Sequence, residues 1–375
     1  MTDIVDMNAN VSSRINLMRI VLISGIVFVH VPYDPANSPF LGTYGMIDWL
    51  RVFLGDSLFR VGVPCLSAIS GYLLFRKGGF DYARTLRSKA STILLPFLLW
   101  NLSFLAFVAL AQSRGMGFGY LPDVLHASPR ELASFAFAVE AWPINLPLYF
   151  LRDLLLCLIL SPLLAFLMRR YPRATLLVFL LYAVLPLPNL IFLKKSILFG
   201  FSVGIGVALH KVDLAAIDRH ARAILFVVLS ATVLLSAGLY LTGPEFPLWL
   251  DMTRSLIALT GILGSWALSA LLVQTWVGQR LSRGGGLSFW IFCGHYPLLI
   301  VLWMIWNRIG SADYPLFYAL APVLAISILV ATHALAQAFF PRLHALLTGN
   351  RIRANRPKSD AERAAGAADY ATQSR

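Results

Sequence analysis

Several ionisable side chains lie within otherwise apolar stretches of the sequence, and the informative ones are Arg19, His30, Arg152, Asp153 and His295. Such groups are costly at membrane depth, so they are suspected of function by default. A guanidinium binds phosphate, and a neutral imidazole takes a proton from a hydroxyl. These residue types therefore predict a site that holds an anionic ligand and activates a hydroxyl group.

The spacing of Arg19 and His30 predicts that both side chains face one cavity. Their separation leaves about 20° in azimuth and about 16 Å along the axis of a helix. A ligand with an anionic head and a long thin arm, such as acyl-coenzyme A, suits that distance. The alternative is that Arg19 anchors the helix at the membrane interface and His30 hydrogen-bonds a neighbouring helix.

The composition indicates that lipid is the solvent for most of the chain. Of 375 residues, 58% are hydrophobic and 13% are charged, and the mean hydropathy is +0.72. A soluble core cannot enclose so much apolar surface, which predicts an all-α, polytopic transmembrane bundle. The net charge of +13 comes from Lys and Arg gathered between apolar runs, a pattern that indicates anionic lipid rather than nucleic acid as the partner.

A transmembrane helix needs about 20 mostly apolar residues. On this criterion a membrane domain at residues 15–340 contains about ten spans, at 15–33, 58–75, 91–112, 146–168, 174–187, 190–209, 222–242, 253–275, 287–308 and 315–339. The fifth and sixth are interrupted by Pro and Lys, so we expect them to be short, kinked or re-entrant. Residues 1–14 precede the domain, and residues 341–375 form a basic tail that we expect to be disordered.

The distribution of basic residues favours a bacterial inner-membrane protein with both termini in the cytoplasm. The longest outer loop, residues 113–145, contains Ser128, Pro129 and Glu131 ahead of an Ala/Phe-rich run. This arrangement is a capping box with Pro at the first helical position, and it predicts a short helix on the outer face.

Five strings occur in an order that resembles one protein family. They are RIVLISGIVFVH (Arg19–His30), PCLSAISGYLLF (Pro64–Phe75), the basic segment with Arg84, Arg87 and Lys89 that leads into RSKASTILLPFLLWN, LPLYFLRDLL with Tyr149 and Arg152, and LSFWIFCGHYPLL with His295. Together they are similar to the acyltransferase family three, the integral-membrane O-acyltransferases of bacterial surface polysaccharides and lipopolysaccharide. The likeness covers roughly residues 14–340. Phe292 stands where this family more usually has Tyr, which counts against a phenol role there.

The resemblance implies transfer of an acyl group, usually acetyl, from cytoplasmic acyl-CoA to a hydroxyl of an envelope or exopolysaccharide sugar. Acyl-CoA is then a co-substrate, the acceptor is a glycan or lipid-linked sugar, and no bound cofactor is expected. His30 is the essential histidine, either as general base toward the acceptor hydroxyl or as a transient acyl carrier. His295 either meets His30 across the cavity or makes a structural hydrogen bond.

The remaining candidates are assigned to the two substrates. Arg19, Arg84 and Arg87 are assigned to the donor phosphates, and control of topology is the alternative for Arg84 and Arg87. Arg152 orients the acceptor or the transferred carbonyl, beside Tyr149, and Asp153 pairs with it or forms a purely structural ion pair. Ser70 and Gly71 are expected to allow close helix approach.

Two other functions remain open at the level of the residues. A transporter of a small anionic or glycan-linked substrate would favour broken spans in matching halves and several buried carboxylates, whereas Asp153 is nearly alone. A membrane haem protein would use His30 and His295 as axial ligands. The three cysteines, Cys65, Cys157 and Cys293, lie in apolar runs without metal-ligand spacing, so we expect them to pack the core and expect no metal site.

Overall fold

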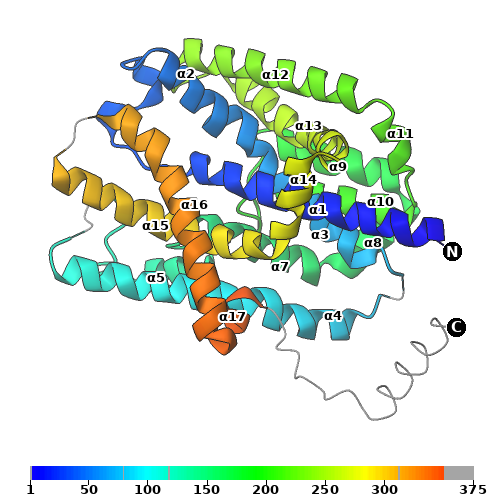
Figure 1. The fold of residues 1–375 in the computed structure, drawn as a ribbon, viewed down its shortest axis with the longest axis horizontal. Helices are drawn as coiled ribbons and strands as arrows, with labels where there is room; N and C mark the ends of the chain where they lie inside the picture. The colour runs from blue at the N-terminus through cyan, green and yellow to red at the C-terminus, as the bar shows by residue number, and fades with distance from the viewer. Residues whose placement is uncertain (1, 79, 117–118, 311–312, 350–375) are drawn as a thin grey trace, which may run out of the picture.

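The fold is known from a computed structural model that describes residues 2–78, 80–116, 119–310 and 313–349, with side chains from Asn10 onward. Within these ranges the chain is helical and contains no β-strand, which confirms the all-α prediction. The long helices pack together in one bundle (Figure 1).

Seven helical segments of the described chain are long and apolar enough to cross a membrane. They are α1 (Thr2–Val29); Met46–Phe75, formed by α2 (Met46–Val52), η3 (Phe53–Leu58), η4 (Phe59–Val61) and α3 (Gly62–Phe75); Tyr82–Ser113, formed by α4 (Tyr82–Lys89), η5 (Ala90–Leu94) and α5 (Leu95–Ser113); α12 (Ala221–Thr242); α13 (Leu248–Leu272); Trp276–Ile309, formed by α14 (Trp276–Ser282), η7 (Arg283–Gly286) and α15 (Leu287–Ile309); and α16 (Tyr314–Phe339). Shorter elements connect them: η1 (Pro35–Asn37), η2 (Pro39–Leu41), α6 (Pro129–Phe137), η6 (Leu146–Leu148), α11 (Leu214–Asp218) and α17 (Pro341–Thr348).

The predicted fourth span, 146–168, is bent by 63° between α7 (Tyr149–Ile159) and α8 (Ser161–Arg170). Pro162 stands in the first turn of α8 and has no N–H to donate to the carbonyl of Leu158. The hydroxyl of Ser161 donates to that carbonyl instead, at 2.7 Å. The bend between α7 and α8 therefore follows from the local sequence Ser161–Pro162.

The prediction of about ten spans is wrong, because the described chain has seven such segments, or eight if the bent pair counts as one. The predicted fifth and sixth spans correspond to α9 (Pro172–Val184) and α10 (Lys195–Leu209), with 13 and 15 residues. At 1.5 Å per residue they are only about 20 Å long, whereas the hydrocarbon core is about 30 Å thick.

Helix α10 nevertheless lies in the middle of the bundle, packed tightly against α3. A Cβ on Gly71 of α3 would lie 2.1 Å from the carbonyl oxygen of Phe201, and one on Gly204 would lie 2.0 Å from that of Ala68. Only glycine fits such a distance between backbones. The expected close helix approach at Gly71 is confirmed.

In the view of Figure 1, helix α1 lies between α12 and α13 on one side and α5 on the other, and it contacts α13 and α15. Most of its apolar side chains between Ile15 and Val27 belong to the main apolar core, where all three cysteines are also buried. The predicted capping box is confirmed at α6, which contacts α5. The backbone N–H of Ser128 donates to the side chain of Glu131 at 2.8 Å, and the backbone N–H of Glu131 donates to Ser128 Oγ at 3.3 Å.

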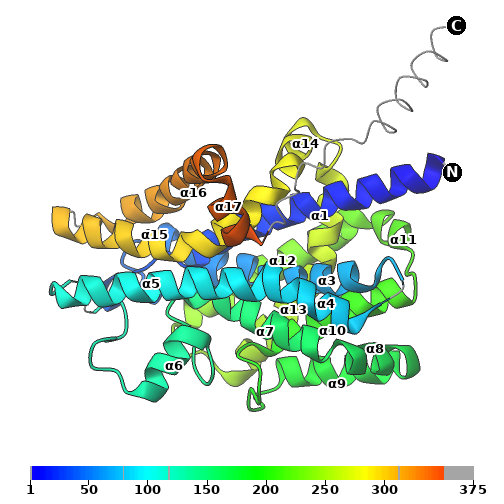
Figure 2. The same cartoon turned by 90° about the horizontal axis from the view of Figure 1, so that it is seen from below.

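Helix α17 starts the predicted tail and packs on α5 and α15 (Figure 2), and residues 350–375 lie outside the described residues.

Candidate active site

Two histidines from distant parts of the chain meet at one end of α1. His30 follows the last residue of α1, and His295 is fully buried in α15. Their rings lie 5.2 Å apart, and Nε2 of His295 is 3.3 Å from Nδ1 of His30. Tyr296 stands edge-on to the His30 ring at 6.0 Å. The contact between the two histidines that the sequence left open is thus present.

The backbone oxygens around the two rings determine which nitrogen carries the proton. Nδ1 of His295 faces the carbonyls of Ile291 and Phe292 at 3.0 and 2.8 Å, and Nδ1 of His30 faces the carbonyl of Ile26 at 3.0 Å. A carbonyl oxygen only accepts, so each Nδ1 is assigned as the N–H donor. The single Nδ1–H of His30 is then shared between the carbonyl of Ile26 at 3.0 Å and Nε2 of His295 at 3.3 Å, and Nε2 of His30 keeps its lone pair. In the described chain no residue hydrogen-bonds this Nε2.

A proline and two asparagines hold the part of α15 that carries His295. Pro297 lies inside the helix and has no N–H for the carbonyl of Cys293, and Asn145 Nδ2 donates to that carbonyl at 3.0 Å. The N–H of Asn145 in turn donates to Asn101 Oδ1 at 3.0 Å, and Asn101 Nδ2 donates to the carbonyls of Phe135 and Ala136. Both asparagines are fully buried. They connect α5, α6 and α15 around the histidine pair.

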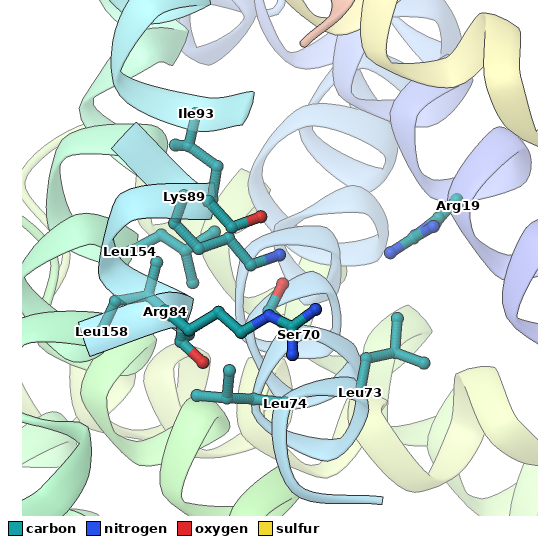
Figure 3. A pocket seen from close by; sticks show the side chains of 11 residues that line it. Arg19, Ser70, Leu73, Leu74, Arg84, Lys89, Ile93, Leu154 and Leu158 are labelled. Carbon is teal, nitrogen blue, oxygen red and sulfur yellow. The ribbon is translucent and has the colours of Figure 1, made fainter. Parts of the chain in front are cut away.

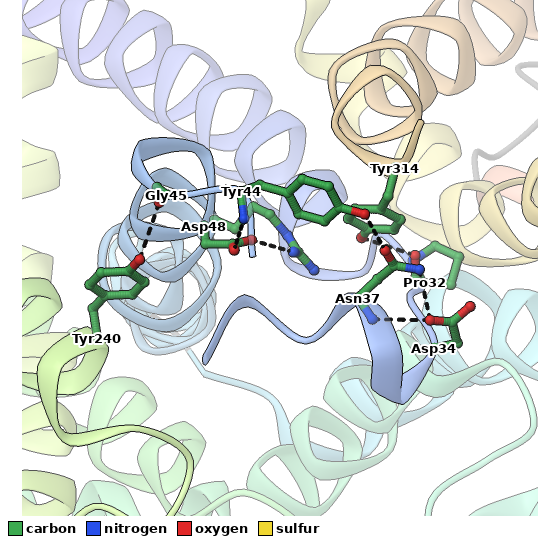
Figure 4. Close-up of polar contacts among 9 residues, drawn as sticks. Pro32, Asp34, Asn37, Tyr44, Gly45, Asp48, Tyr240 and Tyr314 are labelled. Atoms are coloured by element: carbon green, nitrogen blue, oxygen red, sulfur yellow. Dashed lines mark hydrogen bonds and ion pairs between the residues drawn. The ribbon is translucent and has the colours of Figure 1, made fainter. Parts of the chain in front are cut away.

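The chain that leaves His30 is fixed by a network of polar contacts (Figure 4). Tyr314 Oη donates to the carbonyl of Pro32 at 3.2 Å, and Tyr44 Oη donates to Asn37 at 2.7 Å. The buried Arg51 pairs with Asp48 at 2.8 Å and lies over the ring of Tyr314 at 4.3 Å. These contacts hold the residues after α1 against α2 and α16, and so fix His30 at the bundle end.

A pocket of about 310 Å³ lies further back along α1 and is lined by cationic side chains. Arg19, Arg84 and Lys89 point into it from two sides, together with Ser70 and several leucines (Figure 3). Arg84 and Lys89 come from α4, whose N-terminus is capped by Asp81. Three cations around one small space suit a ligand with several phosphates.

Comparison with known proteins decides the family. The sequence profile of the acyltransferase domain matches residues 12–338. The chain belongs to the acyltransferase family three. It is 65% identical over 352 residues to the succinoglycan biosynthesis protein ExoH of Rhizobium meliloti (strain 1021). The aligned residues make up 93% of this chain and 95% of that protein. No solved structure matches. The chain is therefore a multi-pass membrane O-acyltransferase, which decides against the transporter and haem interpretations.

The acyltransferase brings some of the predicted site residues together and leaves others apart. His30 and His295 are in contact, and Arg19 shares the cationic pocket with Arg84. His30 and Arg87 are not among the residues that line this pocket. We predicted one cavity for Arg19 and His30. In the structure Arg19 lines the cationic pocket and His30 lies at the end of α1, about 16 Å further along the helix.

Arg152 and Asp153 form an ion pair of 2.8 Å at the start of α7. Arg152 also donates to the carbonyls of Ala138, Val139 and Ile191. Asp153 is fully buried and accepts from the backbone N–H groups of Leu193 and Lys194. The observed contacts join two loops to α7, and nearby Tyr149 stands edge-on to Trp142 at 4.7 Å.

Several residues of this acyltransferase were not found from the sequence. Asn101 and Asn145 are amides in or beside apolar runs, and that signal points to a buried polar role. Arg60 lies two residues before the Gly-Val-Pro sequence that opens α3, Lys194 is the N-cap of α10, and Arg254 lies within the first two turns of α13. No motif marks these three, because they gather only when η4, α10 and α13 pack together.

Proposed function

We propose that the acyltransferase moves an acyl group from acyl-CoA to a hydroxyl of an exopolysaccharide sugar, free or lipid-linked, with His30 as the general base. The observation that carries the proposal is the 3.3 Å contact of His30 Nδ1 with His295 Nε2, because a ring that donates from Nδ1 keeps a lone pair on Nε2, and no described residue hydrogen-bonds that nitrogen. The name of the relative, a succinoglycan biosynthesis protein, supports an exopolysaccharide acceptor.

The donor phosphates bind at the pocket of Arg19, Arg84 and Lys89 in this proposal. Guanidinium and ammonium groups compensate phosphate charge, and a thin pantetheine arm reaches the distance of about 16 Å from Arg19 to His30 along α1. Anionic lipid attracts the basic segments beside the pocket. The face with the pocket therefore lies on the cytoplasmic side of a bacterial inner membrane, and both termini lie on that side.

The reaction uses one proton and one bond exchange. Nε2 of His30 takes the proton from the sugar hydroxyl while the oxygen forms an ester bond with the thioester carbonyl carbon. The carbon–sulfur bond then breaks, and the coenzyme A thiolate takes the proton back from His30. His295 positions His30 and accepts the hydrogen bond that stabilises the transient imidazolium.

A reconstitution experiment tests this function. The full chain in lipid nanodiscs is mixed with acyl-CoA and with succinoglycan from which the ester groups have been removed by mild alkali. We expect new ester groups on the glycan by mass spectrometry and an equal amount of released thiol. Thiol release without glycan ester would contradict the exopolysaccharide acceptor, and the absence of both products would contradict acyl-CoA as the donor.

A further inference from the structure

Helix α17 lies outside the part of the chain that matches the family's domain. The profile of that domain ends at residue 338, and α17 begins at Pro341. The helix nevertheless packs on α5, α15 and α16, and its residues His344, Ala345 and Thr348 are buried. Isolated helices as short as its eight residues are marginal, so these contacts are what hold α17 in place.

The ring of His344 fixes α17 to the helix that carries His295. It stacks on Trp290 of α15 with ring centroids 5.5 Å apart and an interplanar angle of 25°, and it stands edge-on to His333 of α16 at 4.7 Å. The indole N–H of Trp290 donates to Thr332 Oγ1 at 3.2 Å. Aromatic rings of α15 and α16 thus hold one side of α17.

The C-terminal end of α17 lies on the backbone of η5. Trp100 Nε1 donates to the carbonyl of Leu347 at 3.0 Å, which satisfies one of the last carbonyls of the helix. Gly349 follows with a φ of +64°, and a Cβ on it would lie 2.4 Å from the carbonyl oxygen of Thr92 and 2.7 Å from its Cα. Glycine is required here both for the left-handed backbone and for the close approach.

The segment under this contact contributes to the wall of the cationic pocket. η5 is a single π-helical turn at Ala90–Leu94, and it directly follows Lys89. Lys89 and Ile93 both line the pocket (Figure 3). Isolated π-helical turns are rare and occur frequently at functional sites. Because Gly349 lies on Thr92, α17 supports this turn directly beside the two residues that face the pocket.

We infer that α17 is a positioning element of the donor site, whose end at Gly349 holds η5 so that the ammonium group of Lys89 meets the donor phosphates. The inference rests on the proposed function, which places those phosphates in the pocket. Lys89 contacts the donor, and Gly349 acts only through Lys89. The segment that follows the family's domain therefore contributes to donor affinity and takes no part in the bond exchange.

Gly349→Ala tests the contact, and Gly310→Ala is its matched control. Both glycines end a helix with a positive φ, +64° and +76°, so alanine adds a similar backbone strain at each. At Gly310 no atom of the described residues lies within 4 Å of the new Cβ. In the reconstituted full chain we expect Gly349→Ala to raise KM for acyl-CoA by about tenfold at unchanged kcat, the effect of one lost charged contact. Gly310→Ala should keep the wild-type KM.

A double variant separates positioning from a general loss of stability. Lys89→Ala should raise KM by about tenfold, because one phosphate contact is lost. If Gly349 acts through Lys89, the variant with both substitutions should bind the donor no more weakly than Lys89→Ala alone, whereas independent effects would multiply to about a hundredfold. His344→Ala removes the stacking on Trp290 without adding an atom, so it should raise KM in the same way even if Gly349→Ala does not insert. Leu346→Ala, on the exposed face of α17, should keep the wild-type KM.

A wild-type KM in both Gly349→Ala and His344→Ala would overturn the inference and leave the proposed function intact. A rise of about a hundredfold in the double variant, or a fall in kcat at constant KM, would also overturn it, because α17 would then serve the fold or the histidine pair. If Lys89→Ala keeps the wild-type KM, the pocket does not bind the donor phosphates, and the proposed donor site fails together with the inference.

Discussion

His30 and His295 are separated by 265 residues in sequence, and Nδ1 of one lies 3.3 Å from Nε2 of the other. Both rings turn Nδ1 toward backbone carbonyls of their own helices, which orders the protons along the pair. The geometry follows the logic of other catalytic pairs, in which one group fixes the tautomer of the base. His30 is thereby the member with an available lone pair, and His295 is the positioning residue.

Replacement of His30 by Gln tests general-base catalysis. Gln keeps size and polarity, so the variant should insert normally, yet it cannot take a proton near pH 7. We expect a loss of at least about 10²-fold in acylated glycan per milligram of inserted protein. A mere helix–helix hydrogen bond in a membrane contributes about 0.6 kcal/mol, so near-equal yields would remove His30 from the mechanism.

Replacement of His295 by Phe tests positioning. Phe keeps a buried ring but cannot accept from His30 Nδ1–H, so the His30 ring loses one of the two contacts that orient it and keeps only the carbonyl of Ile26. We expect kcat to fall by about tenfold, as for a lost hydrogen bond to a group that becomes charged, with KM for acyl-CoA unchanged. The measurement is steady-state kinetics with both substrates varied. A rise in KM at constant kcat would show that His295 serves binding instead.

The cationic pocket is tested by Arg84→Ala with Arg87→Ala as the matched control. Both arginines lie on α4, but only Arg84 lines the pocket. Loss of one phosphate contact should raise KM for acyl-CoA by about tenfold and leave kcat unchanged. Arg19→Ala should behave like Arg84→Ala. If Arg87→Ala weakens the donor as much, the effect comes from general surface charge and the pocket assignment fails.

The contact of α10 with α3 is tested by Gly204→Ala. The new Cβ would lie 2.0 Å from the carbonyl oxygen of Ala68, and a helix backbone cannot move aside without repacking. We expect a destabilisation of about 1–3 kcal/mol, the usual cost of overpacking. Thermal unfolding in detergent, monitored by size-exclusion chromatography, measures it. Gly55→Ala, where no atom lies within 4 Å of the new Cβ, should unfold like the wild type; equal stability of both variants would refute the close packing.

The proposed orientation is tested by reporter fusions. The basic segment of α4 and the C-terminal tail should report the cytoplasm, and the loop that contains α6 should report the opposite side. The charges of residues 76–90 are the physical basis, since they resist translocation. A cytoplasmic signal from residues 113–145 would reverse the assignment of the donor pocket to the cytoplasmic face.

The sequence by itself determined the properties that depend on local composition. Apolar length predicted helices in lipid, and the spacing of Ser128 and Glu131 predicted the capping box of α6, because both are set by residues close in the chain. Apolar length alone predicts more spans than the described chain contains. Hydropathy sums apolar residues over a window, but the bend at Pro162 and the shortness of α9 and α10 depend on where hydrogen bonding stops.

Only the tertiary structure decided the chemistry. Which nitrogen of His30 keeps its lone pair depends on the carbonyl of Ile26 and on His295, which is 265 residues away in sequence. These groups lie on helices far apart in sequence, and a hydrogen bond or ion pair requires atoms within a few ångströms. Helices α1 and α15 contact each other directly in the folded chain, and hydropathy along the sequence does not predict which helices become neighbours.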